Sequence, residues 1–194
     1  HRDLFAELQS GQNPKTLLIG CSDSRVDPAI LTDCNPGDLF VVRNVANLVP
    51  PYEIDGAFHG VSSAIEYAVV HLDVSKIIVL GHSGCGGIRA LMDNSSPKTD
   101  ANFIGRWVRI AEAAREQVKR ELAHKTPEGQ IRACEMAAII VSLDNLMSFP
   151  FIAERVQNGT LSLIGWYFDI LRGALYDFDQ DKNAFHALVT SLKE

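Results

Sequence analysis

Three short apolar runs in the first half of the chain place the strongest limit on its fold. Residues 15–20 (KTLLIG), 38–43 (DLFVVR) and 76–81 (KIIVLG) have the pattern of buried strands. Between the second and third runs, residues 60–72 repeat apolar side chains at the period of a helix. A strand, a helix and another strand in this order predict a right-handed crossover and hence a parallel sheet.

The second half of the chain adds helices and a late hairpin to this sheet. We expect an α/β fold with a mostly parallel central β-sheet, flanking helices and a C-terminal antiparallel strand or hairpin. No repeat or linker divides the sequence, so we expect one domain over residues 1–194. The remaining expected elements are a helix starting at 87–92, a loop at 93–100, helices at 101–122 and 128–147, a strand at 161–168 and its hairpin partner at 175–178.

Composition excludes several classes of protein. The net charge is −6 and there is no long basic run, so we expect no nucleic-acid partner. Apolar runs such as 136–141 are too short to span a bilayer, so we expect no membrane segment. No secretory leader is recognisable, so we expect reduced thiols and a cytoplasmic protein, or an organellar one after cleavage of a targeting peptide.

Chemically reactive side chains follow two of the expected strands. The first strand runs into Cys21-Ser-Asp-Ser-Arg25 and the third into His82-Ser-Gly-Cys85-Gly-Gly. Ligands of open parallel sheets bind beyond the carboxyl ends of the strands, where these turns would meet if their strands are neighbours. Two thiolates and one imidazole are a known zinc ligand set that leaves the fourth position open. Cys85 also precedes an expected helix, whose dipole favours a thiolate.

The residues beside Cys21 strengthen this interpretation. Asp23 could accept a hydrogen bond from a metal-bound water, or it could bind the metal itself and close the site. Arg25 could hold that carboxylate in a bidentate pair and keep it off the metal. The alternatives are a surface ion pair, and cysteines that are merely small buried side chains beside a hydrogen-bonded His82. The combination of two strand ends favours the metal site.

Further motifs follow in a fixed order and carry a resemblance to a known family. The set comprises CSDSR at 21–25, RNVAN at 43–47, LVPPY at 48–52, AIEY at 64–67, HSGCGG at 82–87 and GW at 165–166. It resembles the β-class carbonic anhydrases over most of the chain. The resemblance implies a zinc lyase that hydrates carbon dioxide reversibly to bicarbonate and a proton, by attack of zinc-bound hydroxide.

The resemblance also assigns roles to individual residues. It implies that Cys21, His82 and Cys85 bind one Zn²⁺ per subunit. Asp23 and Arg25 would be the catalytic dyad, with Asp23 as a possible fourth ligand in an inactive state.

The substrate site that the resemblance implies is narrow, partly apolar and located at a dimer interface. Its matching positions here are Gln12, Phe40, Val45 and Tyr67, with Gln12 contributed by the partner subunit. We therefore expect a homodimer or a higher homo-oligomer whose small-molecule substrate is carbon dioxide or bicarbonate.

One branch of the family carries an inhibitory bicarbonate site formed by a Trp, an Arg and a Tyr. At these positions the sequence has Leu18, Arg43 and Phe168, with Tyr167 one place earlier and hence on the opposite face of a strand. We therefore predict the plant-like branch, without that site. His59 is a candidate proton shuttle, although a surface or capping role is the simpler interpretation.

Three other functions stay open from the sequence. Some relatives of the family hydrolyse carbon disulfide or carbonyl sulfide with the same ligand set. A non-catalytic zinc scaffold would need Asp23 as a permanent ligand. A thiol redox protein is disfavoured because the chain has no C-x-x-C pair, and Cys34 and Cys134 are expected to be structural.

Overall fold

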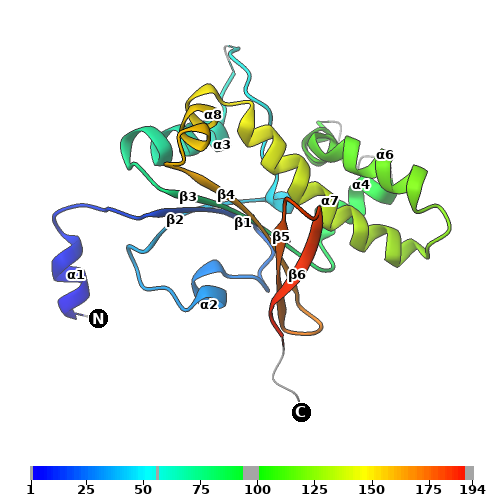
Figure 1. Ribbon diagram of the computed structural model, residues 1–194, viewed down its shortest axis with the longest axis horizontal. Coiled ribbons are helices and arrows are strands. Elements are labelled where there is room, and N and C mark those ends of the chain that lie inside the picture. Colours follow the sequence, from blue (N-terminus) through cyan, green and yellow to red (C-terminus); the bar gives the residue numbers. More distant parts are fainter. Residues whose placement is uncertain (1, 56, 94–100, 191–194) are drawn as a thin grey trace.

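A six-stranded sheet forms the centre of the computed structural model, which describes residues 2–55, 57–93 and 101–190 (Figure 1). The strand order is β2-β1-β3-β4-β5-β6; the first four strands are parallel, and β5 and β6 are antiparallel. This confirms the expected α/β class and the late hairpin, to which β6 adds a strand. The strands are β1 Thr16–Cys21, β2 Leu39–Asn44, β3 Lys76–His82, β4 Ser162–Asp169, β5 Ala174–Asp179 and β6 Ala184–Val189.

Most helices cover one face of this sheet, whereas the short α2 lies on the other (Figure 1). No single described helix is both long and apolar enough to cross a membrane; α7 and α8 meet the criteria only as a pair bent by 94°. The helices are α1 Arg2–Leu8, α2 Pro28–Thr32, α3 Gly60–Glu66, α4 Gly86–Asp93, α5 Phe103–Val108, α6 Glu112–Glu121, α7 Pro127–Met147 and α8 Pro150–Gln157, with the 3₁₀ turns η1 Val45–Asn47 and η3 Arg109–Ala111 and the π-helical turn η2 Tyr67–His71.

The structure departs from the sequence expectations in the helices. The continuous helix expected at 101–122 is interrupted by η3, because Val108, Ala111 and Ala114 are all buried in one cluster and their spacing of three residues fits a 3₁₀ turn. The helix α8 was not expected; it begins at Pro150, where the missing N–H costs nothing. Of the loop expected at 93–100, residues 94–100 lie outside the described part.

The helix α7 packs directly on the sheet at two glycines. A Cβ atom on Gly81 of β3 would lie 2.7 Å from Cδ1 of Ile139, and one on Gly165 of β4 would lie 3.0 Å from Cγ2 of the same side chain. Around this contact the main core joins Leu17 and Val79 of the sheet to Leu143 of α7. The two glycines therefore set how closely α7 approaches β3 and β4.

Parallel pairing places three strand ends side by side. In the register, Cys21 of β1 lies opposite Asn44 of β2, and Gly20 lies opposite Leu80 of β3. The turns after Cys21 and His82 therefore emerge at the same edge of the sheet, as the sequence analysis required.

We predict that Gly81→Ala destabilises the protein by about 1–3 kcal/mol, because the added methyl group overpacks the contact with Ile139. Gly60 has no atom within 4 Å of its Cβ position, so Gly60→Ala is the matched control and should not lower stability. Urea unfolding of both variants tests this. Equal stability of Gly81→Ala and the unsubstituted protein would contradict the close approach of α7.

Candidate metal centre

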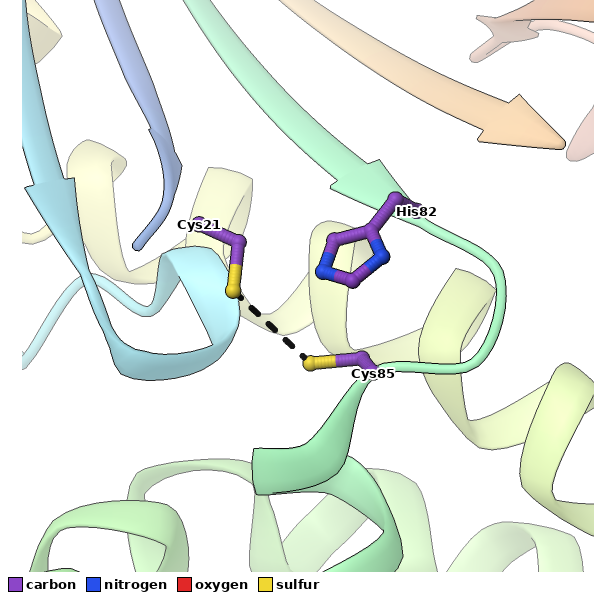
Figure 2. Close-up of side chains that lie close together, drawn as sticks. All are labelled: Cys21, His82 and Cys85. Carbon is purple, nitrogen blue, oxygen red and sulfur yellow. Dashed lines mark hydrogen bonds between the residues drawn. The ribbon is translucent and has the colours of Figure 1, made fainter. Parts of the chain in front are cut away.

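Cys21, His82 and Cys85 converge at the edge where β1 and β3 end (Figure 2). One ligand atom from each side chain lies within 4.8 Å of the other two, and the two sulfur atoms are 4.0 Å apart. All three residues are buried, with exposed fractions of 4 %, 1 % and 2 %. The three side chains therefore form a group, within the described part of the chain, that could hold a metal ion.

The orientation of His82 leaves one nitrogen atom ready to bind. Its Nδ1 lies 3.0 Å from the carbonyl oxygen of Ser83 and so carries the proton that it donates. Its Nε2 is buried and has no hydrogen-bond partner among the described residues. A buried polar atom without a partner is costly, and a metal ion in the space beside the two sulfur atoms would satisfy it. The donor set and its geometry fit a metal that prefers nitrogen and sulfur ligands.

The sulfur atoms of Cys21 and Cys85 lie within hydrogen-bond distance of each other, and either can be the donor. This contact lowers the pKa of Cys21 far below the usual thiol value and raises the pKa of Cys85. The backbone N–H groups of Asp23 and Ala46 lower the pKa of Cys21 further, and those at the start of α4 act on Cys85 in the same direction. Backbone dipoles thus favour the thiolates that a metal requires.

The RNVAN turn after β2 supplies one of these backbone donors. Ala46 and Asn47 have φ values of 66° and 49°, a left-handed conformation that is costly for residues other than glycine. The Asn44 side chain stabilises the turn, because its amide donates to the Leu48 carbonyl at 2.9 Å and its oxygen accepts the Leu48 N–H at 2.8 Å. A Cβ atom on Gly87 would lie 2.9 Å from Cβ of Ala46, so the glycine lets α4 approach this turn.

Asp23 and Arg25 form a bidentate ion pair at the rim of the site. The Arg25 guanidinium donates to the two carboxylate oxygens at 2.9 and 2.7 Å. This hydrogen bonding holds the pKa of Asp23 well below its usual range. The Oδ2 atom of Asp23 lies 3.9 Å from Nε2 of His82 and therefore borders the same space as the ligand atoms.

Arg43 holds the backbone of the first turn in place. Its guanidinium donates to the carbonyl oxygens of Cys21 at 2.9 Å and Asp23 at 2.6 Å. This role of Arg43 differs from the one in an inhibitory site for which its position in the sequence was considered. Of the other residues considered there, Tyr167 is buried toward α7, and Phe168 packs with the cluster around Leu80 on the opposite face of the sheet.

A buried acid that the sequence analysis missed lies against the second turn. Glu135 of α7 is 3 % exposed and accepts the N–H of Cys85 at 2.9 Å. Its second oxygen accepts the hydroxyl of Tyr167 at 2.8 Å. Burial raises the pKa of Glu135, although these hydrogen bonds oppose the shift. The available signal was an acid within the largely apolar stretch 131–143.

The residues expected to form a substrate pocket lie in different places. Phe40 of β2 and Tyr67 at the start of η2 have ring centroids 5.8 Å apart. Val45 follows β2 and is 39 % exposed. Gln12 is exposed in the segment between α1 and β1. The single chain therefore brings Phe40 and Tyr67 together, while the role of Gln12 stays a prediction.

The remaining histidine and cysteine candidates have simple surroundings. His59 directly precedes α3, and its Nε2 lies 2.5 Å from Oδ1 of Asp55. Cys134 is fully buried in α7, and burial raises its pKa to about 12. Cys34 is half-buried and contacts the carbonyl of Thr32.

We predict that Asp23 stays ionised in acid because of Arg25. In the metal-free protein, the ¹³C signal of its carboxyl group should stay constant from pH 7 to about pH 3. In Arg25→Leu it should titrate near pH 4, the ordinary value. Because its pKa is lowered on folding, Asp23 contributes stability above about pH 4 that is lost as the pH falls further. A midpoint near pH 4 in the unsubstituted protein would contradict the pairing.

Comparisons with known proteins agree with this geometry. The family model described as carbonic anhydrase matches residues 16–175. A carbonic anhydrase from Synechocystis sp. is 41 % identical over 179 residues, which are 92 % of this chain but only 65 % of that protein, slightly less than two thirds of its length.

Solved structures give the same result. The β-carbonic anhydrase CcaA is 39 % identical, with a TM-score of 0.91 over 99 % of this chain and 85 % of that chain. A tetrameric β-carbonic anhydrase from Sordaria macrospora is 30 % identical, with a TM-score of 0.77 over 97 % of this chain and 87 % of that chain. With its ligand triad, its sheet and these similarities, the chain belongs to the β-class carbonic anhydrase family.

Proposed function

We propose that this protein is a zinc-dependent carbonic anhydrase that hydrates carbon dioxide reversibly to bicarbonate and a proton. The observation that carries the proposal is the buried group of Cys21, His82 and Cys85, in which Nε2 of His82 has no hydrogen-bond partner within the described part of the chain. Membership of the family supports the same activity.

The ligand set favours zinc over harder cations. Two thiolates bound tetrahedrally to one zinc ion at ~2.3 Å lie ~3.8 Å apart, close to the 4.0 Å between the sulfur atoms of Cys21 and Cys85. A bound zinc ion would lower the pKa of water and so supply a nucleophile near neutral pH. Calcium and magnesium prefer oxygen ligands, which this triad does not offer.

Asp23 and Arg25 would control the reacting water. Asp23 lies beside the triad and is ionised, so its carboxylate can accept a hydrogen bond from the water and orient it. Arg25 donates to both oxygens of that carboxylate, which restrains it from moving onto the metal. The open fourth position, and hence activity, depends on this restraint.

An apolar pocket wall would suit a small uncharged substrate. Phe40, Val45 and Tyr67 would form the pocket wall, in line with the resemblance. Gln12 of the partner subunit would donate a hydrogen bond to an oxygen of the substrate or product.

We propose a homo-oligomer with this pocket at the subunit interface. Exposed apolar side chains occur on the edge strand β2 and on segments beyond it, and such side chains are typical of an interaction surface where they are contiguous. The related protein from Sordaria macrospora is tetrameric. The exposed side chains are Val41, Val45, Tyr67, Val70, Phe103 and Ile104.

We predict that Asp23→Ala keeps its zinc but loses most of its hydration activity, whereas Cys85→Ala loses the metal. The control Cys134→Ala removes an equally buried thiol outside the triad and should keep one zinc ion per chain. Elemental analysis and stopped-flow hydration of carbon dioxide measure both quantities. Full zinc content in Cys85→Ala would contradict the proposed ligand set.

The unsubstituted enzyme should become faster with pH through the mildly alkaline range, because the reaction needs a deprotonated water. A rate that is flat from pH 6 to pH 9 would contradict this mechanism. Complete inactivity on carbon dioxide even at pH 9, in zinc-loaded protein, would favour a scaffold or another substrate such as carbon disulfide.

We predict that Val70→Lys dissociates the oligomer, because it places a charge among the exposed apolar side chains near β2. Leu188→Lys on β6 is the control: Leu188 is 55 % exposed and Val70 is 53 % exposed, but Leu188 lies at the opposite end of the sheet. Light scattering should show a single chain for Val70→Lys and at least two chains for Leu188→Lys. An unchanged assembly of Val70→Lys would place the interface elsewhere.

A further inference from the structure

The peptide group between Gly84 and Cys85 is held from both sides. Its carbonyl oxygen, on Gly84, accepts a hydrogen bond from Nη2 of Arg25 at 3.0 Å. Its N–H, on Cys85, donates to Oε1 of Glu135 at 2.9 Å. A cation at the rim therefore binds one end of the peptide dipole, and an oxygen of a buried acid binds the other.

This peptide group would otherwise have two accessible orientations. Gly84 has a φ of 69°, a left-handed conformation that only glycine adopts easily, and its lack of a side chain leaves the adjoining peptide free to rotate. A flipped peptide would present its carbonyl oxygen to the Glu135 carboxylate and its N–H to the Arg25 guanidinium. An acceptor would then face an acceptor and a donor a donor, so Glu135 and Arg25 together select one orientation.

A buried carboxylate at this position is costly for the helix that carries it. The neighbouring buried positions of α7 are mostly apolar, among them Ile131, Ala138 and Ile139. Glu135 is stabilised there by its hydrogen bonds to Cys85 and Tyr167. Because an apolar residue would suit this face better, the acid points to a role beyond packing.

We propose that Glu135 is a positioning residue of the metal centre. It fixes the peptide group between residues 84 and 85. This orients the Cys85 thiolate and places the Gly84 carbonyl oxygen where Arg25 binds it. Tyr167 in turn fixes Glu135 by donating to its second oxygen. This inference rests on the proposed metal site and deepens it. Through this one peptide group, Glu135 would act on both the ligand Cys85 and the Asp23–Arg25 pair.

The test compares the zinc affinity of the protein and of its variants by competition with a chelator. Glu135→Ala should bind zinc about 10–100-fold more weakly, the usual effect of removing a group that orients a ligand. Glu135→Gln retains an acceptor oxygen for the Cys85 N–H and should recover most of the affinity. Tyr167→Phe keeps the shape of the core and should weaken binding by a smaller factor.

The matched control is Ser142→Ala in the same helix. Ser142 is fully buried and also accepts a loop N–H, from Val49 at 3.2 Å, but it does not touch the ligands. It should lower stability without changing zinc affinity. In NMR spectra of the metal-free protein, the chemical shift of the Cys85 amide proton should move upfield in Glu135→Ala. It should be unchanged in Ser142→Ala.

The outcomes separate this inference from the proposed function. Unchanged zinc affinity in Glu135→Ala and Tyr167→Phe, or an equal loss in Ser142→Ala, would overturn the positioning role while the metal site stands. If Glu135→Ala does not fold, unchanged affinity in Tyr167→Phe alone overturns it. Failure of the unsubstituted protein to bind zinc would overturn the proposed function and this inference together.

Discussion

The parallel pairing of β1 with β3 is the interaction on which the candidate site depends. Cys21 and Cys85 are 64 residues apart in sequence, and their sulfur atoms come within 4.0 Å because neighbouring parallel strands end at the same edge of the sheet. Gly81 and Gly165 contribute by letting α7 lie close to β3 and β4. The helix therefore places Glu135 directly against the Cys85 turn.

Charged side chains hold the backbone of both turns, and their signs match the groups they bind. Arg43 donates to the carbonyl oxygens of the Cys21 turn, and Glu135 accepts an N–H from the Cys85 turn. Arg25 joins the two turns, because it donates to Asp23 in one and to Gly84 in the other. The ligands are thus oriented by hydrogen bonds and ion pairs that the protein itself supplies.

The sequence predicted those parts of the molecule that depend on local patterns. Apolar runs ending in polar turns located β1, β2 and β3, and the strand-helix-strand order gave their parallel direction. The edge strand β6 was missed because residues 184–189 are mostly exposed and lack the alternation of a half-buried strand. The break before α6 was missed because a 3₁₀ turn depends on which neighbours bury Val108 and Ala111, and this is a property of the tertiary structure.

The same distinction explains which site residues the sequence predicted. Cys21, His82 and Cys85 lie in turns whose polar residues stand out after apolar strands, and Asp23 and Arg25 share one of these turns. Glu135 lies in the middle of a helix 50 residues after Cys85 and acts on it only because α7 crosses the sheet at that point. A residue that contacts the reacting groups must carry the right chemistry in its own side chain. A residue that orients them needs only a hydrogen-bonding group in the right place, and the fold decides where that place is.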